Sequence, residues 1–92
     1  MDRQQLLERL GAEFDGSERA VRAVARQAGD LADSGRFAAD ANHELTAGRV
    51  VDNLADAPGE FALVKQWNWW VGSLGLAYGD GYHRFRVRAD IE

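Results

Sequence analysis

Apolar residues recur three and four positions apart through most of the chain, which is the spacing of one face of an α-helix. A first segment follows Asp2, a residue that can cap a helix, and stops at Asp15–Gly16. A second segment begins near Ser17, another cap residue, and Ser34–Gly35 can kink or interrupt it. The apolar and small positions of this second segment form a narrow stripe: Val21, Val24, Ala28, Leu31, Gly35, Ala38 and Leu45.

The second half of the chain contains the clearest helix boundary, at residues 56–60. Because proline is tolerated only in the first turn of a helix, we expect a third helix from about Pro58 to Tyr78. After Gly79–Gly81 the apolar period changes from helical to alternating, which predicts a short strand or an extended arm packed along the helices. The alternation places Phe85, Val87 and Ala89 on one side and Arg84, Arg86 and Arg88 on the other.

These segments predict an all-α fold, a small three- to four-helix bundle with a short extended C-terminal tail, in a single domain over residues 1–92. A domain of this size has a modest stability margin, which favours a homodimer. The absence of Cys excludes disulfides, thiolate metal sites and thiol catalysis. The first residues lack the basic and then apolar run of a secretory signal, so we expect a cytoplasmic protein.

The expected third helix is apolar on more than one side, which is typical of a helix that is buried by two neighbours. A membrane span needs ~20 predominantly apolar residues, and polar residues interrupt this stretch. We therefore expect no membrane insertion. The interrupting residues are Glu60, Lys65, Gln66 and Asn68.

Three tryptophans within four residues point in three directions around a helix and cannot all fill one core. We predict that Trp67 and Trp70 belong to the core. The second face of the helix would then be a self-association or protein-binding interface, unless the tail folds over it. The predicted interface residues are Trp69, Gly72, Ser73 and Leu76.

Motifs for catalysis or cofactor binding do not stand out. The glycines fall within or after an apolar helix with no GK[ST] sequence, and no serine lies in a nucleophile-elbow motif. We predict no catalytic residue, no cofactor and no metal site. Asp40, His43 and Glu44 do share one face of the expected helix, but a metal site would need further ligands, and a solvated polar face is the simpler interpretation.

An alternative function comes from Arg36 and His43, whose Arg-x6-His spacing resembles the catalytic motif of HEPN-type ribonucleases. That resemblance implies a dimeric helical bundle that binds or cleaves RNA. The tail interleaves aromatic and basic residues, as single-strand nucleic-acid contacts do. A net charge of −4 makes nucleic acid the less favoured partner, because phosphate binding depends on concentrated Lys and Arg. The tail residues concerned are Tyr82, His83, Arg84, Phe85, Arg86 and Arg88.

Two stretches carry a broader resemblance, Trp67-Asn68-Trp69-Trp70-Val71-Gly72-Ser73-Leu74-Gly75-Leu76-Ala77-Tyr78-Gly79 and Arg84-Phe85-Arg86-Val87-Arg88. There the chain resembles a group of short uncharacterised proteins of salt-loving archaea. Ten of the eleven basic residues are Arg, and Asp outnumbers Glu, as in salt-adapted proteomes. The resemblance implies no catalytic residues, so the favoured interpretation is a non-enzymatic helical interaction module that forms homo-oligomers.

Overall fold

The computed structural model describes residues 1–91, which form five α-helices, two short 3-10 helices and no strand. An all-helical fold is therefore confirmed, although the number of helices exceeds the three to four predicted. The helices are α1 (Arg3–Glu13), α2 (Glu18–Ser34), α3 (Arg36–Ala41), α4 (Ala47–Ala55) and α5 (Leu63–Tyr78), followed by the 3-10 helices η1 (His83–Phe85) and η2 (Ala89–Ile91).

The first two helices begin where the sequence predicts. The Asp2 side chain accepts a hydrogen bond from the Gln5 backbone N–H at 3.1 Å, and Ser17 Oγ accepts one from Ala20 N–H at 3.0 Å. Both side chains satisfy backbone donors that have no partner inside their helix. Local sequence is sufficient to fix these two starts.

The expected long second helix is instead broken into α2, α3 and a loop. Gly35 adopts a left-handed conformation with φ of 74°, and Asn42 does the same with φ of 63° after α3. A left-handed residue ends a helix because it turns the chain away from the helix axis. Leu45, which the predicted stripe placed on that helix, lies in the following loop and is buried there.

The last long helix begins at Leu63 rather than near Pro58. The Leu63 N–H donates to the Asp15 carbonyl oxygen at 2.9 Å, so a contact with a distant part of the chain sets the start of α5. Gly16 allows this approach, because a Cβ at that position would lie 3.0 Å from Leu63 Cβ. Pro58 and Gly59 therefore belong to the loop that leads to α5.

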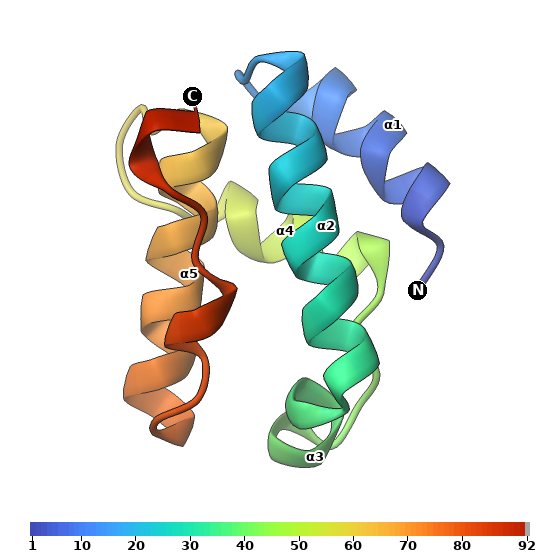
Figure 1. Cartoon of the computed structure of the whole chain (residues 1–92), viewed down its shortest axis with the longest axis vertical. Helices are drawn as coiled ribbons and strands as arrows, with labels where there is room; N and C mark the ends of the chain where they lie inside the picture. Colours follow the sequence, from blue (N-terminus) through green and yellow to red (C-terminus); the bar gives the residue numbers. More distant parts are fainter. Residues whose placement is uncertain (92) are drawn as a thin grey trace.

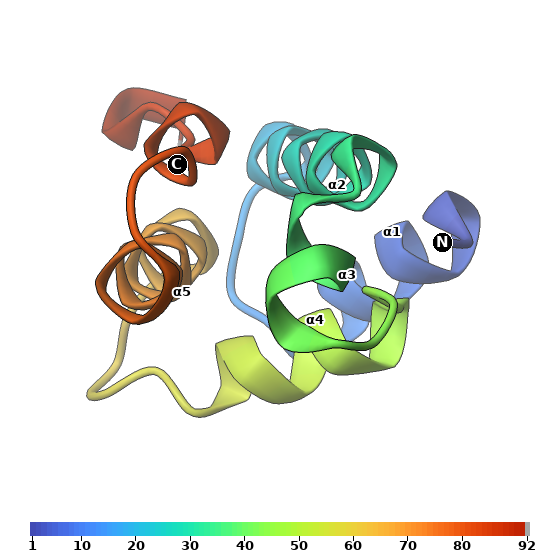
Figure 2. The same ribbon diagram turned by 90° about the horizontal axis from the view of Figure 1, so that it is seen from below.

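The two longest helices lie side by side and run in the same direction, while the chain after α5 turns back and runs along both (Figure 1). Figure 2 shows that this tail and α4 lie on opposite sides of the α2–α5 pair. Helix α1 packs against α2 and α4, which completes the core. The largest fully buried side chains are Trp67, Tyr82, Leu6, Leu10, Leu31, Leu54 and Leu63.

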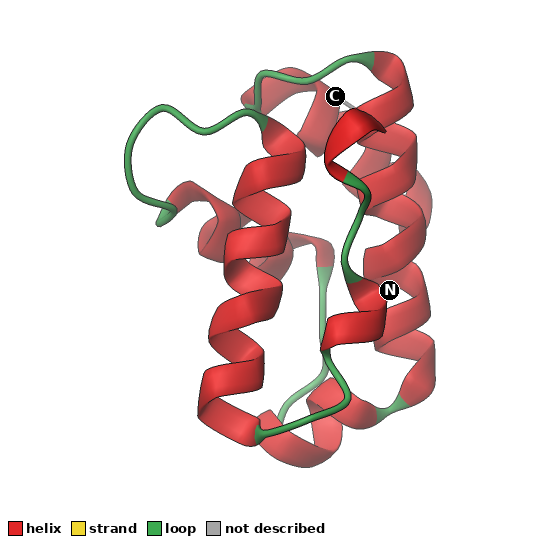
Figure 3. Cartoon of the chain, turned by 60° about the vertical axis from the view of Figure 1, so that its left-hand side comes forward, coloured by secondary structure: helices red, strands yellow, loops and turns green. Residues whose placement is uncertain are grey.

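The tail lies between α5 and α2 as two 3-10 turns joined by an extended stretch (Figure 3). Phe85 and Val87 point inward and are buried, as predicted. Ala89 is exposed because it begins the second 3-10 turn, so the predicted alternation ends after Val87. The predicted strand is absent from residues 82–91; hydrogen bonds from the α5 side chains take the place of strand pairing. The three tail arginines, Arg84, Arg86 and Arg88, are exposed.

Candidate interaction site

Helix α5 presents a row of side chains at helical spacing on its outward face. Leu76 is 92% exposed, an unusual state for a leucine on a helix whose other large apolar residues are mostly buried. Trp69 lies two turns earlier, is half-buried and packs against the edge of the core. Ser73 Oγ donates to the Trp69 carbonyl oxygen at 3.0 Å, so its hydroxyl is engaged within the helix. The face between Trp69 and Leu76 is therefore largely apolar.

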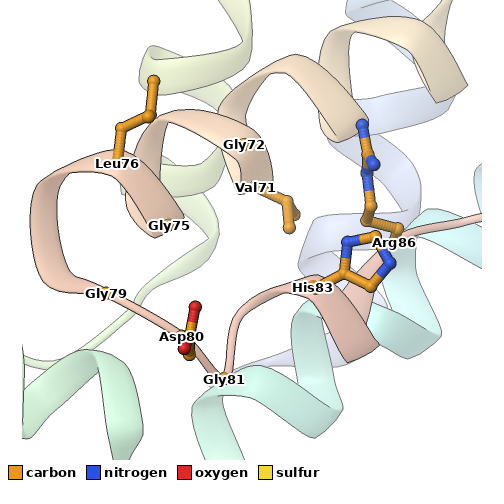
Figure 4. Close-up of a pocket in the computed structure, with 9 residues that line it drawn as sticks. All are labelled: Val71, Gly72, Gly75, Leu76, Gly79, Asp80, Gly81, His83 and Arg86. Atoms are coloured by element: carbon orange, nitrogen blue, oxygen red, sulfur yellow. The ribbon is translucent and has the colours of Figure 1, made fainter.

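A groove of about 420 Å³ lies beside this face, between the C-terminal half of α5 and the turn into η1 (Figure 4). Its α5 side is formed by Val71 and Leu76 together with two glycines. A Cβ added at Gly72 or Gly75 would meet no atom within 4 Å outside the helix, so the helix backbone is open to an approaching group. The groove is lined by Val71, Gly72, Gly75, Leu76, Gly79, Asp80, Gly81, His83 and Arg86.

Charged groups stand at the rim of the groove. Asp80 extends into it from the turn, and His83 and Arg86 lie on the tail side, across from Leu76 (Figure 4). Within residues 1–91 neither the Asp80 nor the Arg86 side chain forms an ion pair. The groove thus combines an apolar floor with one free carboxylate and one free guanidinium.

The Trp67–Trp70 segment also holds the tail in place from the inner side of α5. Trp67 Nε1–H donates to the Phe85 carbonyl oxygen at 2.8 Å. Asn68 binds both backbone groups of Val87: its Nδ2–H donates to the carbonyl oxygen at 2.8 Å, and its Oδ1 accepts from the N–H at 2.9 Å. The two Asn68 bonds explain why a polar residue stands among tryptophans.

Helical spacing does not predict this role of Asn68, which the sequence presents only as an obstacle to membrane insertion. A signal was present, because a polar side chain that interrupts an apolar helix face must find a hydrogen-bond partner if it is buried. The core assignments of Trp67 and Trp70 are confirmed, since they are 0% and 5% exposed. Their rings meet edge to face, with centroids 5.5 Å apart.

Arg36 fixes the turn that leads into the tail. Its Nε donates to Asp40 Oδ2 at 2.8 Å, and its Nη2 donates to the Asp80 carbonyl oxygen at 2.5 Å. The buried Tyr82 donates its hydroxyl to the same Asp40 Oδ2 at 2.7 Å, while the guanidinium lies over the Tyr82 ring, 4.9 Å from its centroid. These contacts form one polar cluster that joins helix α3, the turn after α5 and the tail.

The pKa values of the cluster follow from these bonds. The hydrogen bonds from Tyr82 and then Arg36 lower the pKa of Asp40, because both favour the carboxylate. Burial and the bond to Asp40 raise the pKa of Tyr82, and the bond to Asp40 raises that of Arg36. Around neutral pH Asp40 and Arg36 are therefore charged while Tyr82 stays a neutral hydrogen-bond donor, which suits a structural tie.

Arg36 and His43 do not lie on one helix face, because α3 ends at Ala41 and Asn42 reverses the chain. Arg36 is engaged by Asp40 and the Asp80 carbonyl, whereas His43 is exposed and packs edge to face on Phe37, with ring centroids 5.3 Å apart. The same break in the helix lies within the expected group of Asp40, His43 and Glu44. Residues 1–91 contain no cluster of three or more His, Asp or Glu side chains that can hold a metal ion.

The basic residues of the tail face solvent. Arg86 and Arg88 line a second hollow of about 280 Å³ with Arg26 of α2. The aromatic residues that the sequence interleaves with them, Tyr82 and Phe85, are buried in the core and present no ring for stacking on a base. The arginines of the predicted nucleic-acid motif therefore lie on the surface, whereas its aromatic residues do not.

A family described as the WNWW domain matches residues 1–75, which is most of the chain. The match includes the Trp67–Trp70 segment and ends just before the last turn of α5 and the tail. No curated protein and no solved structure matches the chain. Among the described helices, none is both long and apolar enough to cross a membrane.

Proposed function

The chain belongs to the WNWW domain family, and we propose that it is a non-enzymatic protein–protein interaction module that forms a homodimer through α5 in the cytoplasm. The proposed contact consists of Trp69, Gly72, Ser73 and Leu76 together with the adjoining groove. The exposure of Leu76 carries the proposal. Burying a large apolar side chain contributes ~1.5–3 kcal/mol, and this one is 92% exposed in a single chain.

The shape of the surface favours a second copy as the partner. A twofold dimer needs a patch that is complementary to itself, so that each contact occurs twice. Here a protruding leucine stands next to a hollow whose α5 side includes Gly72 and Gly75, and two copies can exchange these features. The free charges of the rim are also complementary, because Asp80 of one copy can pair with Arg86 of the other.

Sedimentation velocity over a range of concentrations tests the proposal. We expect the wild type to sediment as a dimer and Leu76→Asp as a folded monomer, because a carboxylate cannot enter the glycine hollow. Ala12→Asp is the matched control: Ala12 is exposed on α1, away from the Leu76 end of α5 (Figure 1), and its replacement should leave the dimer intact. A wild type that stays monomeric at the highest concentration contradicts the proposal.

A second candidate, nucleic-acid binding, is favoured by one observation. Arg26, Arg86 and Arg88 face one hollow of an otherwise acidic molecule, and clustered guanidinium groups bind phosphates. Filter binding with single-stranded RNA at rising salt tests it. The expected result is binding that weakens with salt and is lost in Arg26→Ala with Arg86→Ala. Binding that survives this double change would instead argue against the arginine hollow.

A further inference from the structure

Helix α5 holds the tail through its backbone at Phe85 and Val87, whereas Tyr82 is held through its side chain, which donates to Asp40. All three hydrogen bonds from Trp67 and Asn68 go to main-chain atoms of Phe85 and Val87. Main-chain recognition of this kind accepts any extended segment, as in β-strand addition, and leaves selectivity to side-chain pockets. Here three tail side chains are buried: Tyr82, Phe85 and Val87, which are 0%, 3% and 7% exposed.

The tail and the helical surface on which it packs are separate parts of the chain. The residues that form this surface, on α2 and α5, lie inside residues 1–75, which match the WNWW domain family. The whole tail lies beyond that match. Between them runs the exposed turn Gly79–Gly81, in which both glycines have positive φ. This turn contributes no apolar core residue, so the tail is held on α2 and α5 mainly through the contacts described above.

We propose that the seam between α5 and α2 is a peptide-binding site. It takes a segment whose side chains at positions i, i+3 and i+5 are buried, and residues 82–91 of the same chain occupy it with Tyr82, Phe85 and Val87. Asn68 binds the backbone of the residue at position 87, and Trp67 binds the carbonyl two residues earlier. The three tail arginines point outward and do not determine which segment binds. The site binds the same segment when it is supplied as a free peptide.

The site differs from the proposed dimer contact. It uses the side of α5 that faces the tail, whereas the dimer contact uses the exposed Leu76. Because His83 and Arg86 of the tail also line the dimer groove, peptide binding is measured in Leu76→Asp as well as in the wild type.

A nicked protein tests the proposal with every residue of the chain present. A protease site flanked by Gly-Ser is inserted between Gly79 and Asp80, the uncut protein is checked for a wild-type-like melting curve, and the link is then cut. We expect the two pieces to co-elute on gel filtration. A fluorescent peptide of residues 80–92 should then exchange into the complex, and an unlabelled copy should displace it.

The variants in this assay assign the binding to named residues. Asn68→Ala removes two hydrogen bonds to the peptide and should weaken its binding about tenfold or more. Asn53→Ala is the matched control, because the Asn53 amide bonds only its own helix, at the Arg49 carbonyl oxygen. A peptide with Asp at positions 85 and 87 should not compete. Pieces that separate after cutting, or equal effects of the two Asn variants, overturn the proposal.

Hydrogen exchange on the intact wild type gives a second test that needs no insertion. The Val87 N–H is protected by Asn68 Oδ1, so its exchange reports release of the tail. We expect Val87 to exchange faster than Trp70 in α5 in the wild type, and to remain the faster of the two in Asn68→Ala. If Val87 and Trp70 exchange together in both proteins, the tail leaves only when the whole domain unfolds, and the site is not a separable receptor.

Discussion

Replacing Asn68 by Ala removes the only side chain that bonds both backbone groups of a single tail residue in the described part of the chain. The two bonds, of 2.8 and 2.9 Å, are partly buried. A hydrogen bond of this kind contributes roughly 0.5–1.5 kcal/mol, so the loss should be about 2 kcal/mol. Since 1 kcal/mol corresponds to about 4–8 °C in a domain of this size, the melting temperature should fall by about 8–16 °C.

Urea unfolding followed by tryptophan fluorescence measures this loss, with Asn53→Ala as the matched control. Both changes replace Asn by Ala in a helix and gain the same intrinsic helix propensity, so the difference between them isolates the tail contact. Asn53→Ala should cost less than about 0.5 kcal/mol, as surface changes do. Asn68→Asp keeps an acceptor for the Val87 N–H but cannot donate to the Val87 carbonyl, and should be at least as destabilising as Ala. Equal midpoints for Asn68→Ala and Asn53→Ala would refute the account of the tail.

Three further predictions concern other parts of the molecule. Gly81→Ala should destabilise by about 1–3 kcal/mol in thermal melts, because Gly81 has φ of 114° and a Cβ there would collide with the Arg36 guanidinium, whereas Gly11→Ala in open space on α1 should be neutral or stabilising. The folded-state pKa of Asp40 lies below the ordinary value of about 3.9, so its contribution is present above that pH and is lost as pH falls through the folded pKa. The gap in melting temperature between wild type and Asp40→Asn should therefore close on acidification from neutral pH, and a constant gap would contradict the Tyr82 and Arg36 bonds. We also propose that the excess of carboxylates reflects adaptation to salt: melting temperature should rise with KCl as repulsion is screened, and a flat or falling curve would argue against this.

Helix starts were predictable where a local residue sets them. Asp2 and Ser17 cap their helices through bonds to residues three positions on, which sequence spacing reveals. The start of α5 was placed too early because Pro58 marks only where a helix can begin. Its actual start at Leu63 depends on the carbonyl of Asp15, and no local pattern reports a contact across that separation.

The candidate site was likewise predictable only where local spacing determines it. Helical spacing alone placed Trp67 and Trp70 in the core and grouped Trp69 with Leu76 on another face. The groove beside Leu76 could not be predicted, because the returning tail forms its other wall. The Arg36–His43 pairing failed for a local reason, since a left-handed Asn42 interrupts the turn of helix that the pairing requires.

The central claim is that two copies meet through the outward face of α5, and isotope-filtered NMR tests it most directly. A sample that mixes labelled and unlabelled protein reports only contacts between copies. A dimer through this face should give cross-peaks from the Leu76 methyl groups of one copy to the α-protons of Gly72 and Gly75 of the other. A spectrum with no such cross-peaks at concentrations where the protein is dimeric, or with cross-peaks that involve only α1 and α4, would contradict it.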